Sequence, residues 1–310
     1  MITILSGGVG GARFAAGVLH ESHEDEEIIV IVNTADDDVF YGLHVSPDID
    51  TVLYTLSGIG DWARGWGVKD DTFNCNEMLG RLGVENWFKI GDKDLALNLL
   101  RTSLLAQGSK LSQAVEKLRK ALGVRARILP MTDDPVRTII ETDKGTLRFQ
   151  EYFVKHGYQL EIRGIRFAGI DDSEPLPEAL QAIQESDVVA IAPSNPIVSI
   201  GPILALRGVR DAMRRSRATR LAVSPIVGGR TIKGPADKML QALGIEPTAY
   251  GVYKMYRDII DVMVIDKADE KEAERIEAEG KQCFVLNTIM NTLQDARTLA
   301  SQILSKIRRE

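Results

Sequence analysis

A glycine-rich segment near the start of the chain has the composition of a phosphate-binding loop. Residues 6–12 read SGGVGGA and directly follow the short apolar run at residues 2–5. Glycine lets backbone N–H groups approach a phosphate closely, and the N-terminus of a following helix adds positive potential. We therefore expect a bound phosphate here; a tight turn without a ligand is the alternative. The glycines expected to bind the phosphate are Gly7, Gly8, Gly10 and Gly11.

The segment departs from two common nucleotide-binding fingerprints. A dinucleotide loop has a small third residue, where this chain has Arg13. It also has an acid at the tip of the second strand, where this chain has Asn33. A P-loop ends in Gly-Lys-Ser/Thr, which residues 6–12 do not provide. An NAD-dependent dehydrogenase is therefore disfavoured.

Two acidic segments follow the second apolar run and suggest a magnesium site. Residues 33–38 read NTADDD, and residues 46–51 read SPDIDT. Carboxylates near a phosphate loop suit Mg²⁺, which takes one or two of them together with phosphate oxygens. We expect Asp36 and Asp50 to be the metal ligands.

Helix capping is the alternative explanation for part of this acidic cluster. A helix is expected over residues 49–56, and either Ser46 or Asp48 could cap its N-terminus. Asp50 lies too deep in the first turn of that helix to act only as a cap.

Two later loops carry groups that suit a nucleotide. Residues 193–196 read PSNP, in which two prolines fix a rigid loop at the end of an apolar run. Residues 224–238 read SPIVGGRTIKGPADK and combine a glycine pair with cations that could bind a carboxylate or phosphate. A plain turn and a solvated surface loop are the alternatives. The residues expected to contact the nucleotide are Ser194, Asn195, Gly228, Gly229 and Lys233.

Aromatic side chains gather between residues 60 and 90. They are Trp62, Trp66, Phe73, Trp87 and Phe88. Their rings could stack on a flat heterocycle or lie in the core, and the sequence leaves both open.

The order of the elements predicts an α/β fold. Unbroken apolar runs rich in isoleucine and valine are typical of parallel strands that are covered on both faces. They occur at residues 2–5, 28–32, 187–192, 220–224 and 282–286. The first two enclose a glycine loop and a helix, which is one βαβ unit. We therefore expect a doubly wound, Rossmann-like, mostly parallel sheet with the nucleotide at the carboxyl ends of its strands.

The middle of the chain interrupts this alternation. Helical patterns between residues 94 and 122 precede segments at 126–168 that alternate like strands. We interpret residues 57–169 as an inserted helical and antiparallel β region. Residues 1–56 and 170–310 then form the Rossmann-like nucleotide-binding domain.

Composition excludes several classes of function. The 310 residues carry 44 acidic and 38 basic side chains, and this net charge of -6 argues against a nucleic-acid binder. Two cysteines provide neither a disulfide framework nor a zinc quartet. No apolar stretch approaches the about 18 residues that suggest a membrane span, and the first residues lack the basic region of a signal peptide. We expect a cytoplasmic protein that binds no membrane.

Taken together, these segments resemble the 2-phospho-L-lactate transferase family along nearly the whole chain. The matching stretches read, in order, ILSGGVGGARF, VNTADDD, HVSPDIDTVLY, RFQEYFV, APSNPIVSIGPIL and SPIVGGRTIKGPADKM. The resemblance implies an Mg²⁺-dependent transferase in the biosynthesis of the deazaflavin coenzyme F-420. Such an enzyme moves a phospholactyl group from lactyl-2-diphospho-5'-guanosine to the ribityl hydroxyl of 8-hydroxy-5-deazariboflavin and releases GMP.

The resemblance also implies roles for individual residues. Asp50 matches the family's deazaflavin-binding acid, and we expect it to be the catalytic residue. Lys89, within ENWFKIGD, and Asn33 are expected to join it in binding the deazaflavin, and the inserted region would help to form this acceptor site. The partners would be a GDP-type donor and the deazariboflavin acceptor, and a homodimer is left open.

One related family offers an alternative function. The gluconeogenesis/morphology factor family shares a glycine loop and nucleotide-sugar binding but acts as a regulator. The RFQEYFV and SPIVGGRTIKGPADKM stretches favour the transferase. The sequence leaves open whether the donor carries a lactyl, enolpyruvyl or glyceryl group, and how guanine is recognised.

Overall fold

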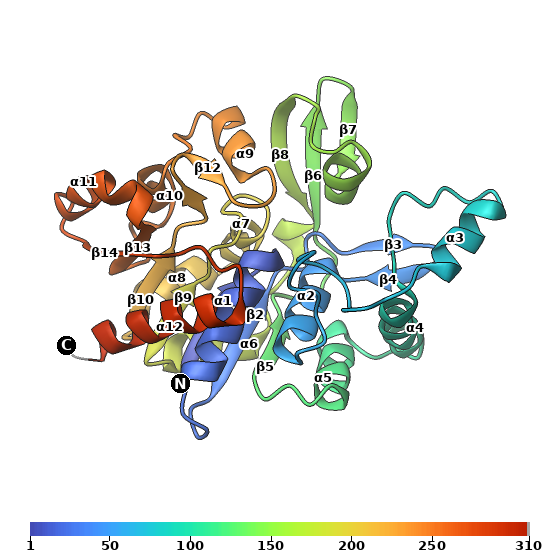
Figure 1. Cartoon of the computed structure of the whole chain (residues 1–310), viewed down its shortest axis with the longest axis horizontal. Coiled ribbons are helices and arrows are strands. Elements are labelled where there is room, and N and C mark those ends of the chain that lie inside the picture. Colours follow the sequence, from blue (N-terminus) through green and yellow to red (C-terminus); the bar gives the residue numbers. More distant parts are fainter. Residues whose placement is uncertain (309–310) are drawn as a thin grey trace.

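The computed structural model describes residues 1–308, and a parallel sheet lies at its centre (Figure 1). The sheet has seven strands. In sheet order they are β14 (Gln282–Leu286), β13 (Val262–Asp266), β10 (Thr219–Val223), β9 (Val188–Ile191), β1 (Ile2–Ser6), β2 (Ile28–Val32) and β5 (Arg127–Pro130). Every neighbouring pair is parallel. The predicted doubly wound, Rossmann-like α/β class is therefore confirmed.

The direction of winding reverses at β1. The chain runs outward from β1 through β2 to β5, then returns to the other side of β1 as β9 and continues through β10 and β13 to β14. In sheets of this kind the loops that follow the two strands at the reversal diverge, which leaves a crevice at the carboxyl ends. Here those loops begin after Ser6 and Ile191. The fold therefore brings two predicted nucleotide loops to one edge of the sheet.

Helices cover both faces of the sheet, and for this reason every residue of β1, β2 and β13 is buried. One face packs against α1 (Gly8–Glu21), α2 (Pro47–Leu56), α5 (Leu111–Ala121) and α12 (Leu293–Ile307). The other packs against α6 (Pro177–Glu185), α7 (Ile200–Ala205), α8 (Val209–Arg215), α9 (Ala236–Ala242), α10 (Ala249–Tyr256) and α11 (Ala273–Glu277). Figure 1 shows α1 and α12 side by side across the front. No helix within residues 1–308 is long and apolar enough to cross a bilayer.

Smaller antiparallel sheets lie outside the central one. They are β3 (Asp38–Phe40) with β4 (Leu43–Val45), the three strands β6 (Arg137–Thr142), β7 (Gly145–Arg148) and β8 (Ile162–Ala168), and β11 (Ile226–Val227) with β12 (Arg230–Thr231). The remaining helices are α3 (Asn74–Arg81), α4 (Asp92–Ala106), the π-helical turn η1 (Glu151–Lys155), and the 3-10 turns η2 (Ile170–Asp172) and η3 (Lys267–Glu272). In Figure 1 the β3–β4 hairpin and α3 extend to one side of the central sheet, and β6–β8 rise beside it.

Several local expectations were wrong. The segment ARILP forms β5, a parallel edge strand of the central sheet paired with β2, and does not belong to the antiparallel patch. The stretch QEYFV, predicted to continue a strand, bends into the π-helical turn at residues 151–155. Helix α1 begins at Gly8, inside the glycine segment that was expected to precede it as a loop. The division into two domains at residues 57 and 169 stays a prediction.

Candidate active site

A cavity of about 460 Å³ opens at the carboxyl ends of the central strands. Its walls come from the loops that follow β1, β9, β10 and β14, from α2, and from the segments around α4 and η1. The loops at residues 6–12, 193–196 and 224–234, which the sequence analysis expected to converge, each contribute lining residues. The crevice expected from the winding of the sheet is therefore present.

The glycine loop is packed closely against its surroundings. A Cβ on Gly7 would lie 2.6 Å from Oδ2 of Asp48, and one on Gly10 would collide with the backbone carbonyl of Pro193. The Gly7 N–H donates to the Ser194 hydroxyl at 3.1 Å. Gly8 has a φ of +60°, in the left-handed region that favours glycine. Close packing thus explains part of this glycine content, while Gly8, Val9 and Gly10 of the first turn of α1 also line the cavity.

Asp48 lies directly against this loop. It is buried, accepts a hydrogen bond from Asn33 Nδ2 at 2.9 Å, and is also bonded by the Gly8 amide. Burial raises its pKa to about 6, although both hydrogen bonds oppose the shift. The capping expectation was wrong, because α2 begins at Pro47 without a side-chain cap and Ser46 donates instead to Asp37. Asn33 itself is fully buried behind Asp48 and does not line the cavity.

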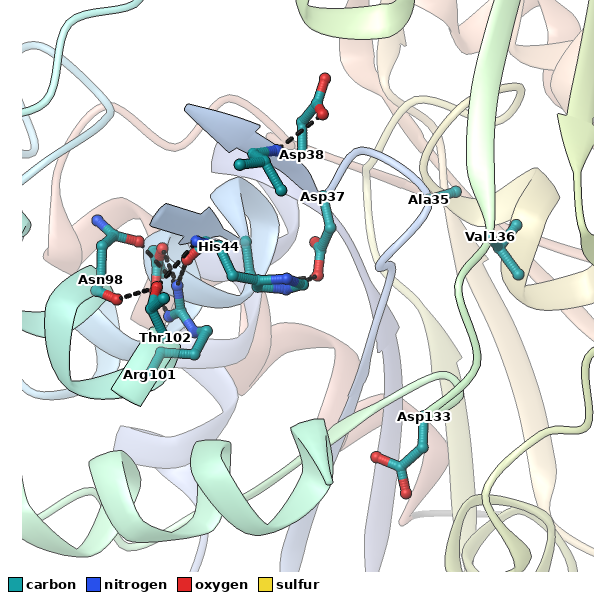
Figure 2. A network of polar contacts seen from close by, with 12 residues as sticks. Ala35, Asp37, Asp38, His44, Asn98, Arg101, Thr102, Asp133 and Val136 are labelled. Atoms are coloured by element: carbon teal, nitrogen blue, oxygen red, sulfur yellow. Dashed lines mark hydrogen bonds and ion pairs between the residues drawn. The ribbon is translucent and has the colours of Figure 1, made fainter. Parts of the chain in front are cut away.

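Asp36 and Asp37 occupy different environments. Asp36 is buried at the cavity wall, and its Oδ1 finds no hydrogen-bond partner among residues 1–308. Burial, and then the nearby charge of Asp48, hold the pKa of Asp36 well above its usual range. Asp37 accepts from the Ser46 hydroxyl at 2.7 Å, and the His44 ring lies 3.1 Å from the same carboxylate oxygen (Figure 2).

Asp50 is bound by a residue that the sequence analysis missed. Both of its carboxylate oxygens face the guanidinium of Arg101, with Nη1 at 3.0 Å from Oδ2. Both side chains are buried, at 0% exposure for Arg101 and 6% for Asp50. Burial raises the pKa of Asp50, and Arg101 opposes that shift. Asn98 accepts from Arg101 at 2.8 Å, and Figure 2 shows the two side chains meeting on α4.

Asp94 adds a further carboxylate to the cavity wall. Its Oδ1 accepts hydrogen bonds from the Tyr54 hydroxyl at 2.6 Å and from Asn98 Nδ2 at 2.8 Å. Burial, followed by the negative charge of Asp50, raises its pKa to about 7. Asp94 is therefore a cavity carboxylate whose protonation changes near neutral pH.

Four cationic residues line the cavity: Arg13, Arg64, Lys89 and Lys233. Arg13 is buried and donates to the backbone carbonyls of Met290 and Trp62, so that it ties the loop after β14 to the loop after α2. Lys233 reaches the Arg64 carbonyl at 3.2 Å, and burial lowers its pKa. Lys89 donates to Asn76 Oδ1 at 3.0 Å. The cavity therefore combines carboxylates with cations that suit an anionic ligand.

Aromatic rings form another part of the wall. Phe149 and Phe153 stack with centroids 5.5 Å apart and line the cavity together with Trp66 and Phe88. Phe88 is also stacked on Phe40, at 3.8 Å. Of the aromatics that the sequence singled out, two therefore face the cavity. The stacked pair, Phe149 just after β7 and Phe153 in η1, was not among them.

Most of the predicted site residues meet at this cavity. Those that line it are Gly7, Gly8, Gly10, Asp36, Asp50, Lys89, Ser194, Asn195 and Lys233. Gly11, Asn33, Gly228 and Gly229 do not line it. A Cβ on Gly11 would collide with Ser6 and Ser194, so this glycine serves close packing.

The glycine pair has a different structural role from the one expected. Gly228 and Gly229 have φ values of +58° and +76° and form the turn of the β11–β12 hairpin. The Gly228 N–H donates to Asp269, at 3.0 Å from each carboxylate oxygen. The loop still reaches the cavity, through Thr231 to Lys233.

The residues missed by the sequence analysis are Tyr54, Asp94, Asn98 and Arg101. One signal could have indicated them: Asp94, Asn98 and Arg101 recur at intervals of four and three on one face of a predicted helix. A polar stripe at this spacing is common on solvated helices, however. Within residues 1–308, no group of three or more His, Cys, Asp or Glu side chains is placed so that together they could hold a metal ion.

Fold and site together define an α/β protein with a cavity, lined by carboxylates and cations, at the reversal of a doubly wound sheet. The family described as 2-phospho-L-lactate transferase CofD matches residues 2–304. A 2-phospho-L-lactate transferase from Methanopyrus kandleri is 42% identical over 307 residues, which cover 98% of this chain and 96% of the relative. The chain belongs to the 2-phospho-L-lactate transferase family and is a transferase.

Two further relatives and one solved structure are also similar to this chain. A 2-phospho-L-lactate transferase from Methanocaldococcus jannaschii is 41% identical over 98% of this chain and 97% of the relative. A phosphoenolpyruvate transferase from Kitasatospora aureofaciens is also 41% identical, over 98% and 97%. A crystal structure of a UPF0052 family member from Bacillus halodurans has a TM-score of 0.64 at 20% identity and covers 98% of both chains, which concerns the fold alone.

Proposed function

We propose that this chain transfers a phospholactyl group from lactyl-2-diphospho-5'-guanosine to the ribityl hydroxyl of 8-hydroxy-5-deazariboflavin and releases GMP. The observation that carries this proposal is the contact between an acidic residue and the glycine loop, in which Asp48 lies against Gly7 and Gly8. Diphosphate chemistry needs both a phosphate cradle and hard oxygen ligands at one place. The family membership of the chain supports the same reaction.

The carboxylates near the glycine loop fit a magnesium ion. Asp36 has a buried oxygen, Oδ1, that has no hydrogen-bond partner within residues 1–308, and the nearby charge of Asp48 adds to the rise in the pKa of Asp36 that burial causes. A divalent cation would relieve both the missing interaction and the repulsion. We therefore assign the metal to Asp36 and Asp48 rather than to Asp36 and Asp50, because Arg101 already neutralises Asp50. When bound, Mg²⁺ would neutralise charge on the diphosphate.

The donor would lie along the glycine loop. The first turn of α1 offers backbone amides to the diphosphate, and Lys233 offers a cation from the loop after β10. In the 193–196 loop, Asn195 Nδ2 is held only by a contact with the Met239 sulfur at 3.4 Å and could turn to the nucleoside, whereas the Ser194 hydroxyl is already bonded to the N–H and carbonyl of Gly7. The loop after β10 and the segment at residues 288–290 close this end of the cavity.

The acceptor would lie toward the aromatic wall. Phe149 and Phe153 can flank a planar deazaflavin ring, which is large and apolar on its faces. Lys89 and Asp50 provide charged groups on the same side of the cavity. In the reaction the acceptor oxygen bonds to the phosphorus that carries the lactyl group. The bond from that phosphorus to the bridging oxygen breaks, GMP leaves, and a carboxylate takes the hydroxyl proton.

An assay of both donor types would test this proposal. The relatives named above include phospholactate and phosphoenolpyruvate transferases at almost equal identity. We expect purified protein with Mg²⁺ and 8-hydroxy-5-deazariboflavin to form product and GMP faster from the lactyl donor than from the enolpyruvyl donor. Faster turnover of the enolpyruvyl donor would contradict the assigned acyl group. Binding of GDP without turnover of either donor would contradict the transferase reaction.

A further inference from the structure

The cavity contains four carboxylates, and their partners differ. Asp48 accepts from Asn33 and Gly8, and Asp36 lies beside it next to the glycine loop. Asp50 is held by Arg101 through both oxygens. A carboxylate that neutralises a buried guanidinium is a weak base, since protonating it would leave that charge unpaired. Asp36 and Asp48 therefore serve the glycine loop and the metal, and Asp50 serves the ion pair with Arg101.

Asp94 is the cavity carboxylate that keeps one oxygen unengaged. It is half-buried at the cavity wall, and its Oδ1 accepts from both Tyr54 and Asn98. Its Oδ2 makes no hydrogen bond with any of residues 1–308. Its backbone N–H is fixed by Asp71 at 3.1 Å, at the start of α4. One oxygen is thus immobilised by two donors while the other is free to meet a ligand in the cavity.

We propose that Asp94 is the proton acceptor for the acceptor hydroxyl in the transfer reaction. This role rests on the proposed function, since the hydroxyl belongs to the deazaflavin acceptor. As the hydroxyl oxygen bonds to phosphorus, its proton moves to Oδ2 of Asp94. The bond from phosphorus to the bridging oxygen breaks at the same centre, and its electron pair leaves with GMP.

The groups around Asp94 set its pKa in a range that suits a proton acceptor. The charged and titratable groups that face it are Asp50 and Tyr54 from α2, Arg101 from its own helix, and Asp71 from the segment before α3. Burial raises the pKa of Asp94 to about 7, where a base combines good basicity with an adequate ionised fraction at neutral pH. Tyr54 opposes that shift by donating to the ionised form.

The test is the pH dependence of turnover at saturating donor and acceptor. In the unaltered protein we expect the rate to fall as the pH drops through about 7, because protonated Asp94 cannot accept a proton. Asp94→Asn should lose this acidic limb and lower turnover by about 10²-fold or more. Asp143→Asn, an exposed change in the β6–β7 turn outside the cavity, should keep both the rate and the limb.

A second variant keeps the inference testable if Asp94→Asn does not fold. Tyr54→Phe removes one hydrogen bond to the ionised carboxylate, so the limb should move to higher pH. An unshifted limb in Tyr54→Phe, or a retained limb in Asp94→Asn, would overturn the role of Asp94 alone. If the unaltered protein forms no product from either donor, the proposed function fails and this role fails with it.

Discussion

Arg101 on α4 and Asp50 on α2 lie 51 residues apart in the chain and form a buried ion pair, with Nη1 at 3.0 Å from Oδ2. The pair joins the helix that carries Asp94 to the helix that carries the acids near the glycine loop. Two segments that line one cavity are thereby held in a fixed relation. Disruption of the ion pair between Arg101 and Asp50 should therefore affect both stability and turnover.

Replacing Arg101 by methionine should strongly destabilise the protein. Arg101→Met keeps an apolar stem of similar size but leaves the Asp50 carboxylate buried and unpaired. Breaking such a pair costs about 3 to 5 kcal/mol of unfolding free energy, which urea denaturation would measure. Arg127→Met removes an exposed pair with Glu27, with side chains 46% and 48% exposed, and should change the free energy by less than about 1 kcal/mol. Equal effects of the two changes would contradict this account.

Asp50→Asn should lower both turnover and melting temperature. The ion pair means that an amide at this position leaves the buried charge of Arg101 uncompensated. We expect turnover to fall by about 10²-fold, because α2 is no longer fixed against the helix that carries Asp94 and a misplacement of about 1 Å can have an effect of this size. We also expect earlier thermal unfolding. Combining Asp50→Leu with Arg101→Met should recover much of the stability, because both charges are gone, without recovering activity. Recovery of activity in that double variant would show that Asp50 acts only structurally.

Gly10→Ala should destabilise the fold as well as weaken nucleotide binding. A Cβ at this position would collide with the Pro193 carbonyl, so the loop after β9 must move. Gly42→Ala is a matched control, because Gly42 has a φ of +80° with nothing within 4 Å of a Cβ, and only backbone strain of about 1 to 2 kcal/mol is expected. Calorimetric GDP titration and thermal melting would measure both effects. A Gly10→Ala protein with an unchanged melting temperature would contradict the close packing.

Lys233→Met should weaken GDP binding without changing the fold. The side chain is exposed at the cavity rim, and within residues 1–308 its hydrogen bond is to the Arg64 carbonyl, so its loss removes little packing. Loss of a charged hydrogen bond to phosphate should raise the dissociation constant by about 10-fold, measured by calorimetry at fixed ionic strength. Lys117→Met on α5, away from the cavity, should have no effect. Equal weakening by both changes would indicate a general charge effect.

Magnesium should stabilise the protein increasingly as the pH rises through about 6. Because burial raises the pKa of Asp48 from 3.8 to about 6, its protonation stabilises the fold at low pH and this contribution is lost as the pH rises through that interval. Metal binding needs the ionised carboxylate, so stabilisation by Mg²⁺ should grow over the same interval. Melting curves with and without MgCl₂ at several pH values would measure both trends. Asp48→Asn should abolish the pH-dependent difference.

The sequence by itself determined the central sheet and the principal loops. The apolar runs that became β1, β2, β9, β10 and β14 are recognisable because strands covered on both faces need continuous apolar residues. The winding of the sheet then places the loops after β1 and β9 on either side of one crevice. For these reasons the glycine loop, the acidic segments and the 193–196 loop could all be assigned to one site before the structure was known.

Only the tertiary structure decided which carboxylate does what. Asp36, Asp48, Asp50 and Asp94 are chemically alike in the sequence, and their differences arise from distant partners such as Asn33, Arg101 and Tyr54. The same applies to Gly228, whose turn is fixed by pairing between β11 and β12 and by Asp269. Burial and hydrogen bonding across the chain set the charge and basicity of each group, and local sequence carries no record of those contacts.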